Sequence, residues 1–485
     1  MSNVSTLFEI VLSSLNIYGL IYLSEVSILA IAGLIGPLLG RRIGFTLLIA
    51  ALLYTLIAST LFSIYMPRKH VLFNGMVVID TYTSVVLAFA AIIAILDTLA
   101  AKNVVERFGV AEPFYAIMAL NILGVLSVAY AGSEILIYTS WILAAVSSYV
   151  IVGLVRDSIA AEAAIKYGVM GAFATVLLLY ALTLNMYLTG SLYLLPTMLL
   201  DKLTLSVFVF LVATSIGFKM GVVPFHAWLP DVYGNARPVL VAIVASSAKI
   251  LATLFILKLL LPPAFTVPDI VAPMIAALAA VTMTYGNLAA LAAPTPQHLL
   301  AYSAIAQAGY LLVGFAGLAY LPTTLPREAM AGVLLQVVGY AFAKSSAFIA
   351  LDYYHELCGS SWSCVKGAVR INNYATLAIV LSLLTLLGVP PSLGFWGKLL
   401  IAFSIVSYSP LLILIMAVNI AISAYYYMKF VYHILFEELS TDVKEVRTLP
   451  SDLRIWTALA SALLSLVLGL ILPGYALSIS TIPLF

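Results

Sequence analysis

Long apolar runs constrain this chain more than any other feature of its sequence. An α-helix rises about 1.5 Å per residue, so about 20 apolar residues cross the hydrocarbon layer of a bilayer. About fourteen such runs occur, at residues 18–39, 43–65, 82–101, 113–130, 133–154, 162–187, 203–231, 238–260, 270–292, 296–318, 329–352, 374–406, 409–436 and 453–474. The runs 203–231 and 374–406 are too long for one straight span and contain glycine and proline, which predicts broken helices. We therefore expect an all-α, polytopic membrane protein.

The composition excludes a water-soluble protein. Of the 485 residues, 64% are hydrophobic and 9% are charged, whereas a soluble domain carries roughly a quarter charged residues. The net charge of +2 provides no basic stripe, so we expect no nucleic-acid partner. Polar segments are too short for a soluble catalytic domain. The chain must act within the lipid bilayer, or through partners that supply the rest.

The sequence offers no clear ligand set for a metal ion or a redox cofactor. Cys358 and Cys364 lie in one loop, CGSSWSC, and a tetrahedral metal site needs about four ligands. A disulfide between these two cysteines remains open. No HExxH or CxxC motif occurs, and no convincing pair of histidines could bind haem. We expect neither a metal nor a cofactor in this chain.

The charges of the loops test the number of spans. If the loop with Arg41 and Arg42 is cytoplasmic, fourteen spans place twelve loop lysines and arginines on that side and five on the other, as the positive-inside rule predicts. Both termini then lie outside. Because the first residues lack a basic segment and a clear cleavage site, we expect the first span to act as its own insertion signal in a bacterial or archaeal plasma membrane.

Five lysines fall inside predicted spans, where a charge costs several kcal/mol. They are Lys219, Lys249, Lys344, Lys398 and Lys429. Lys429 lies about two turns from an acidic segment, so its long stem can carry the ammonium to the headgroups. The other four lie deep in a span or beside a break, among small residues that favour helix contacts over lipid. A buried lysine fixed by a carboxylate is the structural alternative for these four.

The buried lysines and the helix breaks together suggest proton transfer. Burial disfavours the ammonium form of lysine, so buried amines can gain and lose protons near neutral pH. Pro224 in GVVPFHAW, and Pro390 and Pro391 in GVPPSLGFW, predict breaks whose backbone groups need water. The two segments echo each other, as in a duplicated bundle. His226 and His298 are candidate proton relays, and a capping or interface role is the alternative for each.

Several motifs carry a resemblance to a known family. They are AEAAIKYGVMGAFATVLLLYA, GFKMGVVPFHAWLPDVYGNARPV, TYGNLAALAAPTPQHLLAYSAIAQAGYLLVG, GVPPSLGFWGKLLIAF and AYYYMKFVYHILFEE. In this order, over roughly residues 75–440, the chain resembles the antiporter-like, proton-translocating membrane subunits of respiratory complex I, and most closely subunit N of NADH-quinone oxidoreductase. The wider family includes subunits of Mrp-type sodium/proton antiporters and of membrane-bound hydrogenases.

The resemblance implies a division of the chain and roles for its lysines. It implies N-terminal helices one to three in 1–112, two inverted five-helix repeats in 113–260 and 270–436, and a loop with helix fourteen in 437–485. Lys219 and Lys398 look like the lysines of broken helices seven and twelve, and Lys249 like the central lysine of helix eight. Lys344 resembles a helix-eleven lysine of some sister subunits. His298 stands where the family often has a basic residue.

One position departs from the family pattern. The family usually carries a glutamate in helix five that pairs with the helix-seven lysine. The segment ILIYTSWILAAVSSYVIVG matches the family's tryptophan with Trp141 and places Ile142 where the acid belongs. Glu134 lies eight residues earlier, about 12 Å along a helix, so it cannot substitute in the same register.

The sequence alone therefore does not identify the acidic partner of Lys219. Asp97, Glu112 and Glu134 are the candidate acids in or near the spans. If none of them pairs with Lys219, the first half-channel must be gated differently. No two carboxylates share one helical face as in a glycoside hydrolase.

The resemblance implies a function and leaves two other classes as alternatives. It implies proton translocation by a membrane subunit of a complex I-like NADH-quinone oxidoreductase, with electron transfer in a peripheral arm formed by partner subunits. One alternative is an antiporter module of the Mrp or hydrogenase type, for which a carboxylate-rich ion site would be the distinguishing feature. The other is a structural subunit with reduced pumping, which the missing glutamate would explain.

Overall fold

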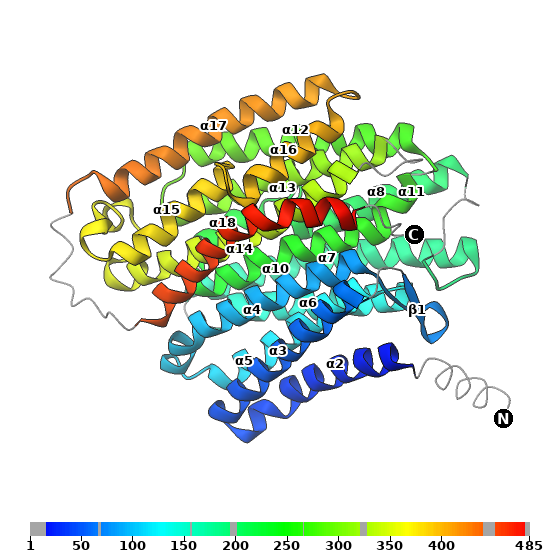
Figure 1. The fold of residues 1–485 in the computed structure, drawn as a ribbon, viewed down its shortest axis with the longest axis horizontal. Coiled ribbons are helices and arrows are strands. Elements are labelled where there is room, and N and C mark those ends of the chain that lie inside the picture. The colour runs from blue at the N-terminus through cyan, green and yellow to red at the C-terminus, as the bar shows by residue number, and fades with distance from the viewer. Residues whose placement is uncertain are drawn as a thin grey trace.

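The computed structural model describes residues 16–65, 69–155, 158–194, 201–264, 266–320, 327–439 and 452–480. Among the loop charges used to assign the sides of the membrane, Arg68, Arg156, Lys444 and Arg447 lie outside these ranges. The chain is a bundle of long helices that run roughly side by side (Figure 1).

The elements follow one another along the chain with short connections. The α-helices are α2 (Ile17–Leu34), α3 (Arg41–Tyr65), α4 (Thr81–Arg107), α5 (Ala111–Ala129), α6 (Glu134–Val152), α7 (Ser158–Thr189), α8 (Lys202–Met220), α9 (Trp228–Asn235), α10 (Pro238–Phe255), α11 (Leu261–Ala264), α12 (Pro268–Leu291), α13 (Pro296–Tyr320), α14 (Arg327–Cys358), α15 (Asn373–Leu387), α16 (Leu393–Ile405), α17 (Pro410–Leu435) and α18 (Leu453–Ile479). A π-helical segment, Ile256–Leu260, joins α10 to α11, and short 3₁₀ turns lie at Gly36–Leu39, Phe73–Gly75, Trp362–Cys364 and Ala368–Arg370.

Thirteen helical segments of the described ranges are long and apolar enough to cross a membrane. The shorter helices α15 and α16 together occupy the run 374–406. Each of the fourteen apolar runs thus contains at least one helix. The prediction of an all-α, polytopic membrane protein is confirmed, whereas the two inverted repeats and the domain boundaries remain predictions.

The centre of the bundle consists of helices that are buried on all sides. All of the most apolar stretch of α10 and of α14 is buried, and nearly all of that of α13, against 33% for α2, α7 and α17. In Figure 1, α10, α13 and α14 lie in the middle, with α2 and α17 at opposite edges. A side chain on a central helix therefore faces other helices, as do Lys249 on α10 and Lys344 on α14.

Two half-helices end in the same way. At the end of α8, Gly221 adopts φ 74°, and at the end of α15, Gly388 adopts φ 93°. Glycine is the residue that adopts this left-handed conformation without a steric penalty. Three residues after each glycine is a proline preceded by a cis peptide bond, Pro224 in one case and Pro391 in the other. The sequence echo between GVVP and GVPP therefore corresponds to one repeated backbone arrangement.

Helix α18 packs directly on the interruption between α15 and α16, at Gly469. A Cβ added there would lie 2.0 Å from the carbonyl oxygen of Pro391. We expect Gly469→Ala to lower the free energy of unfolding by about 1–3 kcal/mol because the backbone at the break must shift. Thermal unfolding of the detergent-solubilised chain measures this effect. The matched control is Gly474→Ala in the same helix, where an added Cβ meets nothing within 4 Å. Equal losses in the two variants would contradict the close approach.

A small hairpin between α3 and α4 was missing from the sequence-based prediction. Strands β1 (His70–Leu72) and β2 (Val77–Ile79) pair antiparallel, with His70 opposite Ile79. The dipeptide Asn74-Gly75 between two apolar segments is a hairpin signal. Because each strand has only three residues, the periodicity of the strands was too short to detect.

Candidate functional site

Lys219 lies in the last turn of α8 and is 2% exposed. Its Nζ donates to the Ser148 hydroxyl at 3.1 Å and to the Tyr167 hydroxyl at 3.3 Å, and it lies 3.5 Å from the Ala144 carbonyl oxygen. These groups come from α6 and α7. Hydroxyl groups both donate and accept hydrogen bonds, so this amine can lie beside them in either protonation state.

Lys249 and Lys398 each contact the carboxyl end of an interrupted helix. The Lys249 amine on α10 donates to the carbonyl oxygen of Met220, the last residue of α8. The Lys398 amine on α16 donates to the carbonyl oxygens of Leu386 and Leu387, the last residues of α15, at 2.6 and 2.9 Å. The final carbonyls of a helix lack intrahelical partners and carry partial negative charge. Each interruption therefore creates a site that stabilises a cation inside the bundle.

Lys344 lies on α14 and is completely buried. Its amine donates to the Ser303 hydroxyl of α13 at 2.6 Å and also to the Leu300 carbonyl oxygen. The ring of Tyr340 is close to both this amine and that of Lys249, with its centroid 6.0 Å from Lys344 Nζ and 5.7 Å from Lys249 Nζ. The structure thus brings the amines of α10 and α14 near one aromatic ring.

A second polar connection leads from α13 to Lys398. Gln307 on α13 lies one helical turn after Ser303 and donates to the Leu386 carbonyl oxygen at 2.8 Å. That same oxygen accepts from Lys398. Gln336 on α14 donates to the Gln307 side chain at 2.8 Å. We call Lys219, Lys249, Lys344 and Lys398 the lysine row.

The lysine row has two properties that matter for its chemistry. In the described part of the chain, none of its four amines forms an ion pair with a carboxylate. The hydroxyl of Tyr340, whose ring is close to Lys249 and Lys344, is buried without a hydrogen-bond partner among the described residues. Buried polar groups of this kind are usually satisfied by water. The lysine row therefore combines amines that have no carboxylate partner with polar surroundings that favour bound water.

The structure places the three candidate acids away from Lys219. Asp97 on α4 is buried and accepts from the hydroxyls of Ser246 on α10 and Ser345 on α14. It lines a cavity of about 10 Å³, roughly the room that one water needs. Glu134, at the start of α6, accepts from Asn185. Glu112 lies in the first turn of α5 and forms no ion pair with Lys219.

Ile142 lies on the outer face of α6. It is 37% exposed, whereas the groups of α6 that contact Lys219 belong to Ala144 and Ser148. In the isolated chain, the position where the family carries its glutamate therefore faces outward. The hydroxyls of Ser148 and Tyr167 occupy the immediate surroundings of the Lys219 amine.

The predicted histidines and prolines lie at the edges of this site. His226 follows the α8 interruption and packs against the Tyr285 ring at 4.3 Å between centroids, with its Nδ1 unpartnered among the described residues. The His298 ring pairs with Thr295 at 2.9 Å and lies against Gly234 in the last turn of α9. Pro224 is exposed, as are Pro390 and Pro391. These residues shape the ends of half-helices and do not contact the lysine row through any described hydrogen bond.

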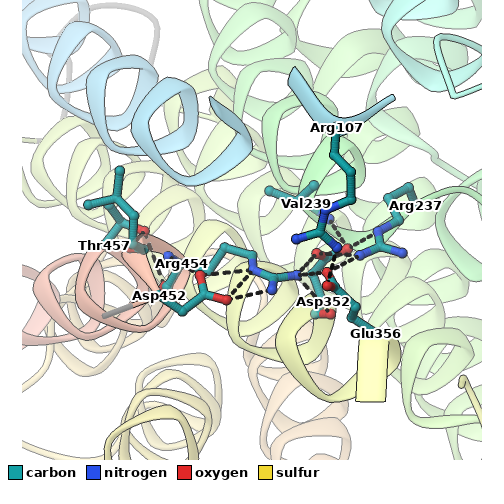
Figure 2. A network of polar contacts seen from close by, with 9 residues as sticks. Arg107, Arg237, Val239, Asp352, Glu356, Asp452, Arg454 and Thr457 are labelled. Carbon is teal, nitrogen blue, oxygen red and sulfur yellow. Dashed lines mark hydrogen bonds and ion pairs between the residues drawn. The ribbon is translucent and has the colours of Figure 1, made fainter. Parts of the chain in front are cut away.

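An ionic cluster that was not predicted from the sequence joins α14 to its neighbours (Figure 2). Asp352 of α14 is completely buried. It pairs with Arg237, just before α10, at 2.6 Å and with Arg454 of α18 at 2.7 Å, and it also accepts from the Val239 backbone N–H at 3.3 Å. One carboxylate thus joins three helices.

The cluster continues on both sides of Asp352. Glu356, one turn later on α14, accepts from Arg237 at 3.0 Å and from Arg454 at 2.7 Å, and it pairs with Arg107 at the end of α4. Asp452 accepts from Arg454 Nε at 3.0 Å. The three arginines and three carboxylates balance in formal charge. The cluster therefore fixes the ends of α4, α10 and α18 against α14. Three of these helices contain residues discussed above: Asp97 on α4, Lys249 on α10 and Lys344 on α14.

The spacing of the two acids could have revealed this cluster. Asp352 and Glu356 are four residues apart in DYYHE, so they lie on one face of α14, and the expectation that no two carboxylates share a helical face was wrong. A pair of acids at the end of an apolar span indicates a site for arginines. In the same region, Cys358 and Cys364 are free in this structure.

Comparison with known proteins identifies the family. A family model described as the transmembrane region of NADH:quinone oxidoreductase and Mrp antiporters matches residues 131–423, which is more than half of the chain. The chain belongs to this NADH:quinone oxidoreductase/Mrp antiporter family. The resemblance found in the sequence is thereby confirmed.

Two relatives in this family have the same name. The chain is 30% identical to NADH-quinone oxidoreductase subunit N of Acidithiobacillus ferrooxidans over 429 residues, which cover 86% of this chain and 87% of the relative. It is 31% identical to subunit N of Alkalilimnicola ehrlichii over 404 residues, or 80% and 81% of the two chains. The similarity extends beyond the motifs to most of both proteins.

Two solved structures share the fold of this chain. A chain of respiratory complex I from Thermus thermophilus with bound aureothin matches with a TM-score of 0.77 and 26% identity, over 94% of this chain and 98% of that chain. A chain of the Mrp complex from Dietzia matches with a TM-score of 0.79 over 95% and 96%, but with 17% identity. The Mrp similarity therefore concerns the fold alone.

Proposed function

We propose that this chain translocates protons across the membrane as a membrane subunit of a complex I-like NADH:quinone oxidoreductase. The observation that carries the proposal is the lysine row, four buried amines that contact carbonyl and hydroxyl oxygens but no described carboxylate. An amine held by a carboxylate stays charged, whereas an amine held by neutral oxygens can lose its proton at a smaller cost. Family membership and the relatives named subunit N support the same function.

The contacts of the row suggest how a proton moves along it. Lys219 lies in the last turn of α8, and the carbonyl of the next residue, Met220, holds the amine of Lys249. The Tyr340 ring lies within about 6 Å of the amines of both Lys249 and Lys344. Hydroxyls and water can pass a proton because each both donates and accepts. The protein's contribution is to hold these groups at fixed positions away from lipid, so that a proton has a continuous polar route.

The remaining steps of the route lie in the second half of the chain. Lys344 contacts Ser303 on α13, and Gln307 on the same helix contacts the carbonyl that also holds Lys398. The carbonyl ends of α8 and α15 favour a positive charge at Lys249 and Lys398. We propose that charge moves between these two carbonyl-held positions through Lys344.

The partners and the location follow from the same proposal. Electron transfer takes place in a peripheral redox arm, and this chain contributes no redox chemistry. Other membrane subunits and lipid cover the exposed apolar faces of α2, α7 and α17. The loop charges orient the ends of α4 and α14 toward the cytoplasm and both termini outward, in a bacterial or archaeal plasma membrane.

A direct experiment distinguishes proton transport from sodium transport. The assembled complex is reconstituted in proteoliposomes and supplied with its electron donor, in buffers that contain either sodium or choline as the only monovalent cation. We expect internal pH to change at the same rate in both buffers, because the row consists of amines, and hard cations such as sodium prefer oxygen ligands. A pH change that requires sodium would instead favour an antiporter module, and no pH change would favour a structural subunit.

A further inference from the structure

We propose that a cavity beside α17 binds the phosphate headgroup of an anionic phospholipid. The cavity encloses about 220 Å³, and its lining combines basic and aromatic side chains with apolar ones. The lining residues that carry the argument are Trp362, Lys366, Tyr425, Lys429 and His433. None of them belongs to the lysine row, so the proposal is independent of the proposed route for protons.

The cavity lies at the level where several helices end. Leu291 ends α12, Pro296 begins α13, and Leu435 ends α17, and the cavity is lined by residues from all three helices and from the turn that contains Trp362. Helix ends mark the boundary between hydrocarbon and headgroups. Exposed aromatic residues of α17, Tyr425 among them, are typical of that boundary.

The charges of the cavity favour an anion. Lys366 and His433 share one carboxylate, that of Glu437, at 2.9 and 2.6 Å. The hydrogen bond from Lys366 holds the pKa of Glu437 below its usual range. Lys429 has no ion pair or hydrogen bond among the described residues. Two lysines and a histidine thus face one carboxylate, which leaves an excess of positive charge.

The outer surface of α17 favours a lipid over a soluble anion. Its exposed residues recur at helical spacing on one face: Leu411, Leu414, Val418, Tyr425, Met428 and Tyr432. Such an apolar stripe can lie along an acyl chain while the headgroup occupies the cavity above it. The loop charges place this end of the bundle on the cytoplasmic side, and basic pockets between transmembrane helices on that side bind anionic headgroups.

The test is a binding measurement on the full chain, purified in an uncharged detergent. Native mass spectrometry compares retention of phosphatidylglycerol and phosphatidylcholine by the wild type and by Lys366→Gln/Lys429→Gln. We expect the wild type to prefer phosphatidylglycerol, and the double variant to bind it about 30-fold more weakly, a factor of about five for each lysine. The control Lys102→Gln/Lys202→Gln, which removes two lysines outside the cavity, should bind phosphatidylglycerol like the wild type.

Two further measurements make the proposal falsifiable in other ways. Glu437→Gln removes the competing carboxylate and should tighten binding of phosphatidylglycerol, whereas weaker binding would overturn the charge argument. Inorganic phosphate at the concentration of the lipid should not displace it, and equal competition would show a soluble-anion site instead. Equal retention of the two lipids, or equal binding by the wild type and the lysine double variant, would also overturn the proposal.

Discussion

Replacing Arg454 with leucine is expected to lower the free energy of unfolding by about 3–5 kcal/mol, because the change leaves buried carboxylates without a partner. Arg454 is 4% exposed and pairs with Asp352, Glu356 and Asp452. Asp352 would retain only Arg237 as a charged partner. Since Arg454 is the arginine of α18 in the cluster, we also expect α18 to detach first. Denaturant unfolding of the detergent-solubilised chain measures the loss.

The control for this variant is Arg42→Leu. Arg42 is an exposed arginine at the start of α3, and its removal should change stability by no more than about 0.5 kcal/mol. Limited proteolysis adds a local readout, because cleavage near α18 should rise in the Arg454 variant alone. If both arginine variants unfold at the same denaturant concentration, the cluster does not hold α18 in place.

Replacing Lys398 with methionine is expected to slow proton translocation by at least about 10-fold, because a positioned proton-transfer group typically contributes about 100-fold or more. Methionine has a similar length but no group that can carry a proton. The carbonyl oxygens of Leu386 and Leu387 would lose their amine donor. The initial rate of dye-reported acidification in inverted membrane vesicles, driven by the electron donor of the complex, measures the effect.

The matched control for Lys398 is Lys202→Met. Lys202 is an exposed lysine at the first position of α8 and lies outside the lysine row. Its replacement should leave the rate of acidification unchanged. Immunodetection of the assembled complex in the same vesicles separates lost transport from lost assembly. Normal acidification by fully assembled Lys398→Met complex would remove this lysine from the route.

The lysines of the candidate site were predictable from sequence, but their partners were not. A charged residue in an apolar run has an unfavourable free energy of insertion, which indicates a functional role. The sequence alone therefore identified four such residues, Lys219, Lys249, Lys344 and Lys398. Their contacts are backbone carbonyls and hydroxyls from distant helices, such as the Met220 carbonyl and the Ser303 hydroxyl. Every residue has a carbonyl, so only the three-dimensional packing shows which ones are used.

The helix breaks were also only partly predictable from the sequence. Proline and glycine in two long runs predicted where helices end, because proline lacks an N–H and glycine tolerates positive φ. The direction of the broken ends was not predictable. It is this direction that points the carbonyls of α8 and α15 at Lys249 and Lys398.

The ionic cluster was missed for a different reason. Asp352, Glu356 and Arg454 lie near the ends of apolar runs, where charged residues ordinarily face water. Burial there results from the packing of α18 onto α14, two helices about a hundred residues apart in the chain. The spacing of Asp352 and Glu356 indicates one acidic helical face that can bind arginines, but it does not show whether that face is solvated or buried.

The most direct test of the account counts the protons moved for each pair of electrons. The purified complex is reconstituted in proteoliposomes in three forms, as wild type, with Lys219→Met and with Lys398→Met, and electron flow and proton movement are recorded together. We predict a lower ratio of protons to electrons in both variants than in the wild type. An unchanged ratio in both would contradict proton transfer through the buried amines of this chain.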